Sequence, residues 1–158
     1  MKRLFILLLI TCLSSTLFGQ HFKVQHATSR RWVSQSNTNQ RGAEYRLIIQ
    51  AQKKFKNLTI SRVWISDKCY AIESLIVDDK SISSSNQKIA KGTSIKIYIN
   101  AKEVLNSNGI WILNNDDCKG TIPQNLQKNS IIIEYIANET PCTMTIKDVE
   151  ILAPIQFN

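Results

Sequence analysis

The chain has 158 residues, with 20 basic and 12 acidic side chains and a net charge of +8 at pH 7. The basic residues are scattered along the sequence, and the densest groups are Arg30–Arg31 and the lysines at positions 53, 54 and 56. This excess of positive charge favours an anionic partner such as an acidic polysaccharide, or it serves only to keep the surface solvated. We expect no nucleic-acid partner.

The N-terminal segment has the features of a secretory signal peptide. Lys2 and Arg3 precede an apolar run over Leu4–Leu13, and Gly19 supplies a small residue for cleavage. The run is about half the length of a membrane-spanning helix, and no later run is longer, so we expect no transmembrane segment. The sequence therefore predicts a signal peptide over residues 1–19 and a protein that is secreted or periplasmic.

Cleavage after Gly19 leaves residues 20–158, which are 139 of the 158 residues and the usual size of one domain with its own core. Loss of the two basic residues of the leader lowers the net charge from +8 to +6. Lipid attachment at Cys12 is the alternative to free release.

The mature chain consists of short strand patterns separated by polar turns. Apolar and polar side chains alternate over Tyr45–Ala51, and Ile95, Ile97 and Ile99 share one face of a second such pattern. Further strands are predicted over Phe22–Thr28, Leu58–Ile65, Tyr70–Val77, Ile110–Leu113, Ile131–Ala137 and Thr143–Leu152.

One helical turn and three long loops are predicted between the strands. Asn100 followed by Glu103 resembles a capping box, which predicts a single helical turn over Ala101–Asn106. Long loops on a rigid β fold are common places for binding. The segments without a strand pattern are Val33–Ala43, Asp78–Ala90 and Asn114–Ser130.

The C-terminal part of the chain predicts an antiparallel hairpin over Ile131–Leu152, because Asn138–Pro141 is a compact turn between two strands. The buried parity changes between Ile146 and Val149, and a β-bulge there accounts for the change. Eight strands in about 130 residues predict an all-β fold, a single antiparallel immunoglobulin-like β-sandwich of about 7–8 strands.

The signal peptide takes one of the four cysteines and leaves Cys69, Cys118 and Cys142 as disulfide candidates. An odd number in an oxidising compartment leaves one thiol free or paired with another chain. If Ile110–Leu113 pairs with Ile131–Ala137, Cys118 and Cys142 lie near opposite ends of the latter strand, roughly 20 Å apart and beyond the ~7 Å limit for bridged Cα atoms. The expected bond therefore joins Cys69 to one of the other two.

Catalytic signatures are missing from the sequence. The two histidines, His21 and His26, lie near the mature N-terminus, and neither belongs to a known nucleophile signature. We therefore expect no enzyme activity and no cofactor. Copper at the histidines and calcium at Asn114–Gly120 are alternatives, although the latter segment lacks the ligand spacing of a calcium loop.

Aromatic and basic residues are the candidate binding residues. Trp32 lies between Arg31 and a polar loop, so we expect it to be exposed and able to stack on a sugar ring, with Arg30 and Arg31 beside it to attract an anionic group. Trp64 and Trp111 lie in predicted strands, and we expect them to pack inside the fold.

A set of structural residues follows a fixed order along the chain. They are Trp32, Gly42 and Tyr45, then Val63-Trp64-Ile65 with Asp67 and Lys68, then Lys91-Gly92, and an ending from Ile146 through Leu152 to Pro154. In this order the chain resembles a group of small, uncharacterised exported β-sandwich proteins of Bacteroidota-type bacteria. It departs from their pattern at Ala43-Glu44, where a Gly-Thr pair is usual, and at Thr93. The resemblance implies export and a β fold, and it carries over no functional residue.

These features predict an exported, non-enzymatic binding or interaction module whose partner is an anionic polysaccharide or an envelope protein. A carbohydrate-binding module that uses Trp32 is one alternative. A small hydrolase or metal-dependent enzyme without a recognised motif is the other.

Overall fold

The computed structural model describes residues 20–82, 86–113, 118, 121 and 130–157. The predicted signal peptide and most of Asn114–Gly120 fall outside this part of the chain. Within it every regular element is a strand and none is a helix, which confirms the predicted all-β class. The strands are β1 Phe22–Ser34, β2 Gln40–Ala51, β3 Phe55–Ile65, β4 Lys68–Tyr70, β5 Ser74–Val77, β6 Lys80–Ile82, β7 Gln87–Ile89, β8 Ser94–Leu105, β9 Trp111–Leu113, β10 Ile131–Ala137, β11 Thr140–Ile146 and β12 Glu150–Phe157.

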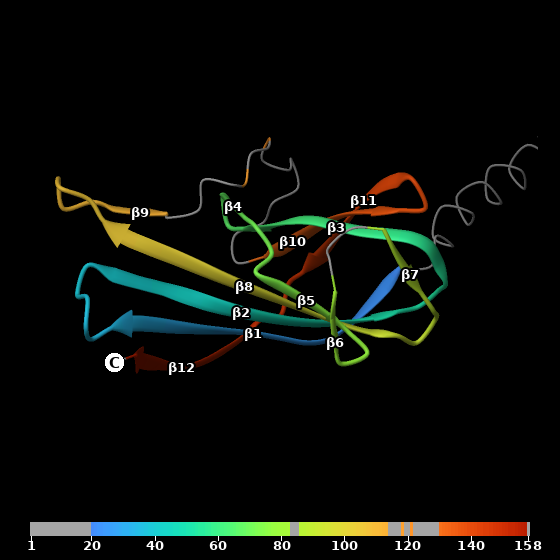
Figure 1. The fold of residues 1–158 in the computed structure, drawn as a ribbon, viewed down its shortest axis with the longest axis horizontal. Coiled ribbons are helices and arrows are strands. Elements are labelled where there is room, and N and C mark those ends of the chain that lie inside the picture. Colours follow the sequence, from blue (N-terminus) through green and yellow to red (C-terminus); the bar gives the residue numbers. More distant parts are fainter. Residues whose placement is uncertain (1–19, 83–85, 114–117, 119–120, 122–129, 158) are drawn as a thin grey trace, which may run out of the picture.

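The strands form two sheets that pack face to face (Figure 1). Sheet A has the order β12-β1-β2-β8-β5-β6, with β9 attached to β8, and sheet B has the order β11-β10-β3-β4, with β7 attached to β3. The predicted two-sheet β fold is therefore confirmed. The described residues contain twelve strands rather than 7–8, and the fold is not purely antiparallel because β12 runs parallel to β1.

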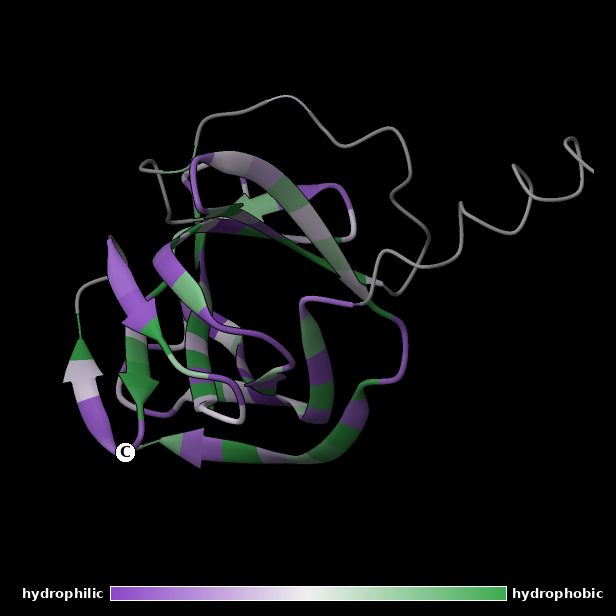
Figure 2. Cartoon of the chain, turned by 90° about the vertical axis from the view of Figure 1, so that its right-hand side faces the viewer, coloured by the Kyte–Doolittle hydropathy of each residue, from purple (hydrophilic) through white to green (hydrophobic). Residues whose placement is uncertain are grey.

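The core lies between the two sheets and is built by period-two alternation. Buried and partly buried residues alternate along the first half of β8, where Ile95, Ile97 and Ile99 all face the core. Figure 2 shows the resulting alternation of hydrophobic and hydrophilic bands along the strands of both layers. Sheet B contributes Ile131 and Ile133 to the same core.

Two segments predicted as irregular or helical are strands. The predicted long loop over Val33–Ala43 is mostly strand, because β1 continues to Ser34 and β2 begins at Gln40. The predicted helical turn over Ala101–Asn106 is also wrong, because β8 runs to Leu105 along β2. Pairing with a neighbouring strand overrides the local capping signal there.

The predicted strand over Tyr70–Val77 is divided between the two sheets. Tyr70 ends β4 in sheet B, whereas β5 begins at Ser74 in sheet A. The predicted loop over Asp78–Ala90 contains β6 and β7, so it is not a free loop in its described part.

The predicted C-terminal hairpin is confirmed for β10 and β11. Ala137 pairs with Thr140, and the two residues between them have positive φ angles, 48° at Asn138 and 71° at Glu139, as a tight hairpin turn requires. The predicted bulge after Ile146 is wrong. The chain instead leaves sheet B and continues as β12 at the edge of sheet A, which explains the change in buried parity.

A disulfide joins Cys69 to Cys118, and Cys142 is free. This confirms that Cys69 pairs with one of the other two cysteines. The strand pairing assumed for that expectation is wrong, because β9 pairs with β8 rather than with β10.

Candidate functional site

The inner face of sheet A extends beyond sheet B at one end of the molecule. The strands β1, β2 and β8 have 13, 12 and 12 residues, and their ends project past the short β4 (Figure 1). A cleft of ≈ 430 Å³ lies between this projecting part and β4. We call it the cationic cleft and define it by side chains that line it, Arg31, Val33, Arg41, Tyr45, Tyr70 and Glu103.

Strand alternation brings the lining residues to one face. Tyr45 packs against the core, so Arg41, four residues earlier on β2, points to the same side of the sheet. Arg41 lies opposite Glu103 of β8 on one side and opposite Val33 of β1 on the other. Arg31 of β1 lies opposite Ala43, which also packs against the core.

Glu103 accepts hydrogen bonds from two cations. The Arg41 Nε atom lies 2.9 Å from its Oε2, and the Lys68 Nζ atom lies 3.2 Å from its Oε1. Burial alone raises the pKa of Glu103, but the two hydrogen bonds and charges outweigh burial and hold the pKa below its ordinary value. Glu103 is therefore a carboxylate that links β2, β8 and β4 across the cleft.

Arg41 also stacks on an aromatic ring. Its guanidinium carbon lies 4.1 Å from the centroid of the Trp111 ring. Trp111 pairs with Leu105 in the β8–β9 ladder and is half-buried, so the expectation that it packs inside is correct only in part. The stacking fixes the position of Arg41, and it leaves part of the indole accessible beside the cleft.

Two tyrosines form the inner wall of the cleft. Burial raises the pKa of Tyr45, which the nearby Arg31 charge partly offsets, and burial also raises the pKa of Tyr70. Both are therefore neutral phenols at pH 7. A phenol at the inner end of a cationic cleft offers a hydroxyl group that donates or accepts a hydrogen bond.

Trp32 is not the exposed platform that the sequence predicts. Its side chain is 7% exposed and lies on the other face of sheet A, over Gly42, where its Nε1 donates to Asn100 Oδ1 at 3.1 Å. The ring of Phe157 packs against it edge-on at 5.9 Å between centroids. The ring covers a glycine and is itself covered, so it has no free face for a sugar.

The two predicted arginines separate because successive strand residues point to opposite faces. Arg31 faces the cationic cleft and is exposed, whereas Arg30 does not line it. The Arg30 Nε atom is buried and has no hydrogen-bond partner within the described part of the chain. Of the three predicted binding residues, Arg31 and the buried Trp32 line the cleft and Arg30 does not.

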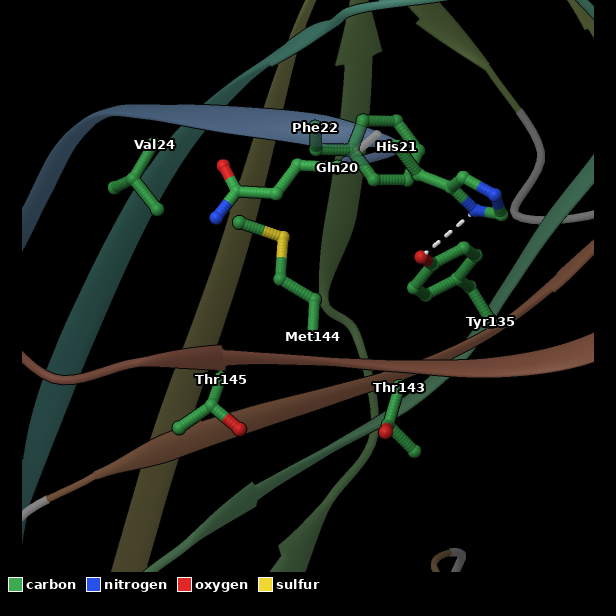
Figure 3. A pocket seen from close by; sticks show the side chains of 8 residues that line it. All are labelled: Gln20, His21, Phe22, Val24, Tyr135, Thr143, Met144 and Thr145. Atoms are coloured by element: carbon green, nitrogen blue, oxygen red, sulfur yellow. Dashed lines mark hydrogen bonds between the residues drawn. The ribbon is translucent and has the colours of Figure 1, made fainter. Parts of the chain in front are cut away.

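A second, smaller pocket lies at the opposite end of the sandwich. Its volume is ≈ 250 Å³, and His21, Tyr135 and Met144 line it (Figure 3). The Tyr135 hydroxyl and His21 Nδ1 share a hydrogen bond of 3.0 Å. Burial, and then the charge of Lys53, lower the pKa of His21, so the imidazole is neutral at pH 7.

The residues that the sequence offered as metal ligands lie apart or outside the described part of the chain. Among the described residues no group of three or more histidine, cysteine, aspartate and glutamate side chains is close enough to hold an ion. The proposed calcium segment Asn114–Gly120 lies outside the described residues except for Cys118, which is bonded to Cys69. The free Cys142 belongs to β11, and its side chain packs against the core.

Sequence reasoning missed most of the cleft. Arg41 and Glu103 fell in segments interpreted as a loop and a helical turn, and Trp111 was assigned to the interior. One signal was present in the sequence: Arg41, Ala43 and Tyr45 continue the alternation of the strand that follows them.

No protein-family model matches this chain, and no curated protein matches it. The function is therefore inferred from the geometry of the cleft. No helix within the described residues is long and apolar enough to cross a membrane.

Proposed function

We propose that the protein is an exported binding module and that the cationic cleft binds an acidic sugar unit of an anionic polysaccharide. The observation that carries the proposal is the charge arrangement. Glu103 neutralises part of the charge of Arg41 and Lys68, whereas Arg31 faces the cleft and has no carboxylate within ion-pair distance among the described residues. Arg31 is thus available for an anionic group of a ligand.

The remaining surfaces of the cleft suit a sugar ring. Val33 is 48% exposed and, with Ala43, gives an apolar patch on the floor. The half-buried Tyr45 offers a hydroxyl that matches the hydroxyl groups of a sugar, and Trp111 lies beside the cleft, where Arg41 stacks on its ring. A uronic acid has these three features, an apolar ring face, hydroxyls and one carboxylate.

The ionisable groups of the cleft favour binding over catalysis. Glu103 is kept ionised and accepts two charged hydrogen bonds, so it is a poor general acid. The raised pKa values of Tyr45 and Tyr70 make both poor general bases at neutral pH.

An immunoglobulin-like fold is part of the proposal. The immunoglobulin plan has one sheet of strands A, B, E and D and a second sheet of strands C, F and G. In sheet A the neighbouring strands β1, β2, β8 and β5 correspond to A, B, E and D. In sheet B the strands β3, β10 and β11 correspond to C, F and G. The parallel β12 and the short β9 are additions to that plan. Trp64 lies on the strand that corresponds to C and is 2% exposed, as the sequence predicts, although it pairs with Ile132 and is not part of the core cluster between the sheets.

The proposal includes export by way of the signal peptide over residues 1–19. The Cys69–Cys118 disulfide is compatible with an oxidising compartment outside the cytoplasm.

Binding is tested with a chain that starts at Gln20, which retains all twelve strands. We expect it to bind polygalacturonate, a polymer of uronic acid, with a change in tryptophan fluorescence, and not to bind neutral dextran. Arg31→Gln should weaken binding at least about tenfold, because a hydrogen bond to a charged group contributes about 1.5–3 kcal/mol.

Arg46→Gln is the matched control, because Arg46 lies on the outer face of sheet A and is 57% exposed. It removes the same charge without touching the cleft. Equal binding of dextran and polygalacturonate, or equal losses for Arg31→Gln and Arg46→Gln, would contradict the proposal.

A further inference from the structure

The end of the molecule opposite the cationic cleft is rich in lysine. The strand β1 runs the length of the sandwich, and its 13 residues at about 3.3 Å each separate the two ends by roughly 40 Å. We call the far end the lysine end and define it by six side chains, Lys23, Lys53, Lys54, Lys56, Lys88 and Lys91.

Strand pairing gathers these lysines from distant parts of the sequence. Phe22 at the start of β1 pairs with Ala51 at the end of β2, just before the turn that contains two of the lysines. Phe55 pairs with Ile89 and Leu58 with Gln87, so Lys88 lies beside the bulged pair Lys56 and Asn57. The turn after β7 is held to the same place by the bond from Gly92 N to Ala51 O, at 2.8 Å.

All six lysines are exposed, and none takes part in an ion pair within the described residues. Like charges close together on adjacent strands repel each other, so the proximity of Lys56 and Lys88 does not stabilise the sheet. The turns at this end also carry the carboxylates Asp78, Asp79 and Glu139, of which Asp79 is paired with Lys96, and the six lysines leave a positive excess. Such an excess attracts an anionic surface.

The chain enters the fold at the lysine end. Gln52 N donates to His21 O at 2.9 Å, which places the first described residues beside the lysine-bearing turn. The apolar run Leu4–Leu13 therefore connects to the domain at this end. While that run is in a membrane, the lysines are the part of the domain that is nearest to the lipid headgroups.

We propose that the lysine end docks on the surface of an anionic phospholipid bilayer, with the cationic cleft directed away from it. Lipid phosphates are the occupant because the exposed cations gather at the end where the chain enters the domain from its predicted leader, so this end faces the membrane surface during export. Six exposed lysines on one end give an attraction that is electrostatic and therefore weakened by salt. The proposal is independent of the ligand of the cleft.

The test is cosedimentation of the chain that starts at Gln20 with vesicles. We expect binding to vesicles of phosphatidylcholine with about a third phosphatidylglycerol, loss of binding with added salt, and no binding to pure phosphatidylcholine. Each lysine near an anionic surface contributes about fivefold to partitioning, so replacing Lys53, Lys54 and Lys91 together with glutamine should reduce it about a hundredfold.

A second triple variant, with glutamine at Arg46, Lys102 and Lys147, removes the same charge away from the lysine end and should retain most of the binding. Arginine at positions 53, 54 and 91 should restore binding, which separates charge from misfolding. If the two glutamine variants lose vesicle binding equally, net charge rather than the lysine end drives the binding, and the proposal is wrong. Binding to dextran sulfate without binding to the anionic vesicles would assign the surface to a soluble polyanion and overturn the proposal.

Discussion

Gly42→Ala should lower the stability of the protein, although glycine is normally the poorer residue in a strand. A Cβ atom at this position would lie 2.3 Å from the carbonyl oxygen of Ala101 and 2.7 Å from the nearest ring atom of Trp32. Ordinary carbon–oxygen contacts begin at about 3.3 Å. The new methyl group is thus about 1 Å too close to the backbone of β8.

The magnitude follows from two opposing effects. Alanine in place of glycine inside a strand stabilises by roughly 0.5–1 kcal/mol. Overpacking costs about 1–3 kcal/mol, and the upper part of this range applies because the clash is with a ladder carbonyl of Ala101 rather than a flexible side chain. The net loss is about 2 kcal/mol, which corresponds to a drop in Tm of about 8 °C at ~4 °C per kcal/mol for a domain of this size.

Thermal unfolding followed by circular dichroism measures the effect. In a Trp32→Phe background, the same change at Gly42 should still destabilise, because a smaller ring relieves the contact with the indole but not the contact with the carbonyl. A Tm that rises, or that stays within about 1 °C of the original, would refute the close approach of β2 and β8 at this point.

Three further outcomes are expected. Replacing both Cys69 and Cys118 with serine should cost about 4 kcal/mol in unfolding free energy, because the bond closes a sequence separation of 49 residues; chemical denaturation of the two forms measures it, and unchanged midpoints would contradict it. The lowered pKa of Glu103 stabilises the fold above about its ordinary value of 4.5 and loses this effect as the pH falls through the lower folded-state value. The difference in Tm between the original chain and Glu103→Gln should therefore shrink on acidification, and a difference independent of pH from 7 to 3 would count against the ion pairs. Tyr135→Phe removes the hydrogen bond to His21 and should cost about 1 kcal/mol at neutral pH, measured by urea unfolding, whereas no loss would mean that the bond has no net value.

The sequence alone determined the β class of this protein and some of its pairings. Alternation over Tyr45–Ala51 and around Ile97 is a local property, and a period of two fits a strand regardless of its neighbours. The hairpin of β10 and β11 was equally local, because Asn138 belongs to a residue type that adopts the positive φ angle of a turn readily. The involvement of Cys69 in the disulfide was also predicted.

The tertiary structure decided which faces are covered. Asn100 and Glu103 have the spacing of a helix cap, but β2 offers a full ladder to that segment, so it extends β8 and turns Glu103 into a partner for Arg41. The sequence predicts that Trp32 is exposed, because only the pairing of β1 with β2 places Gly42 beneath its ring. The switch from β11 to β12 follows from the same cause: alternation says which residues share a face, and only the packing of one strand on another decides whether that face is core or cleft.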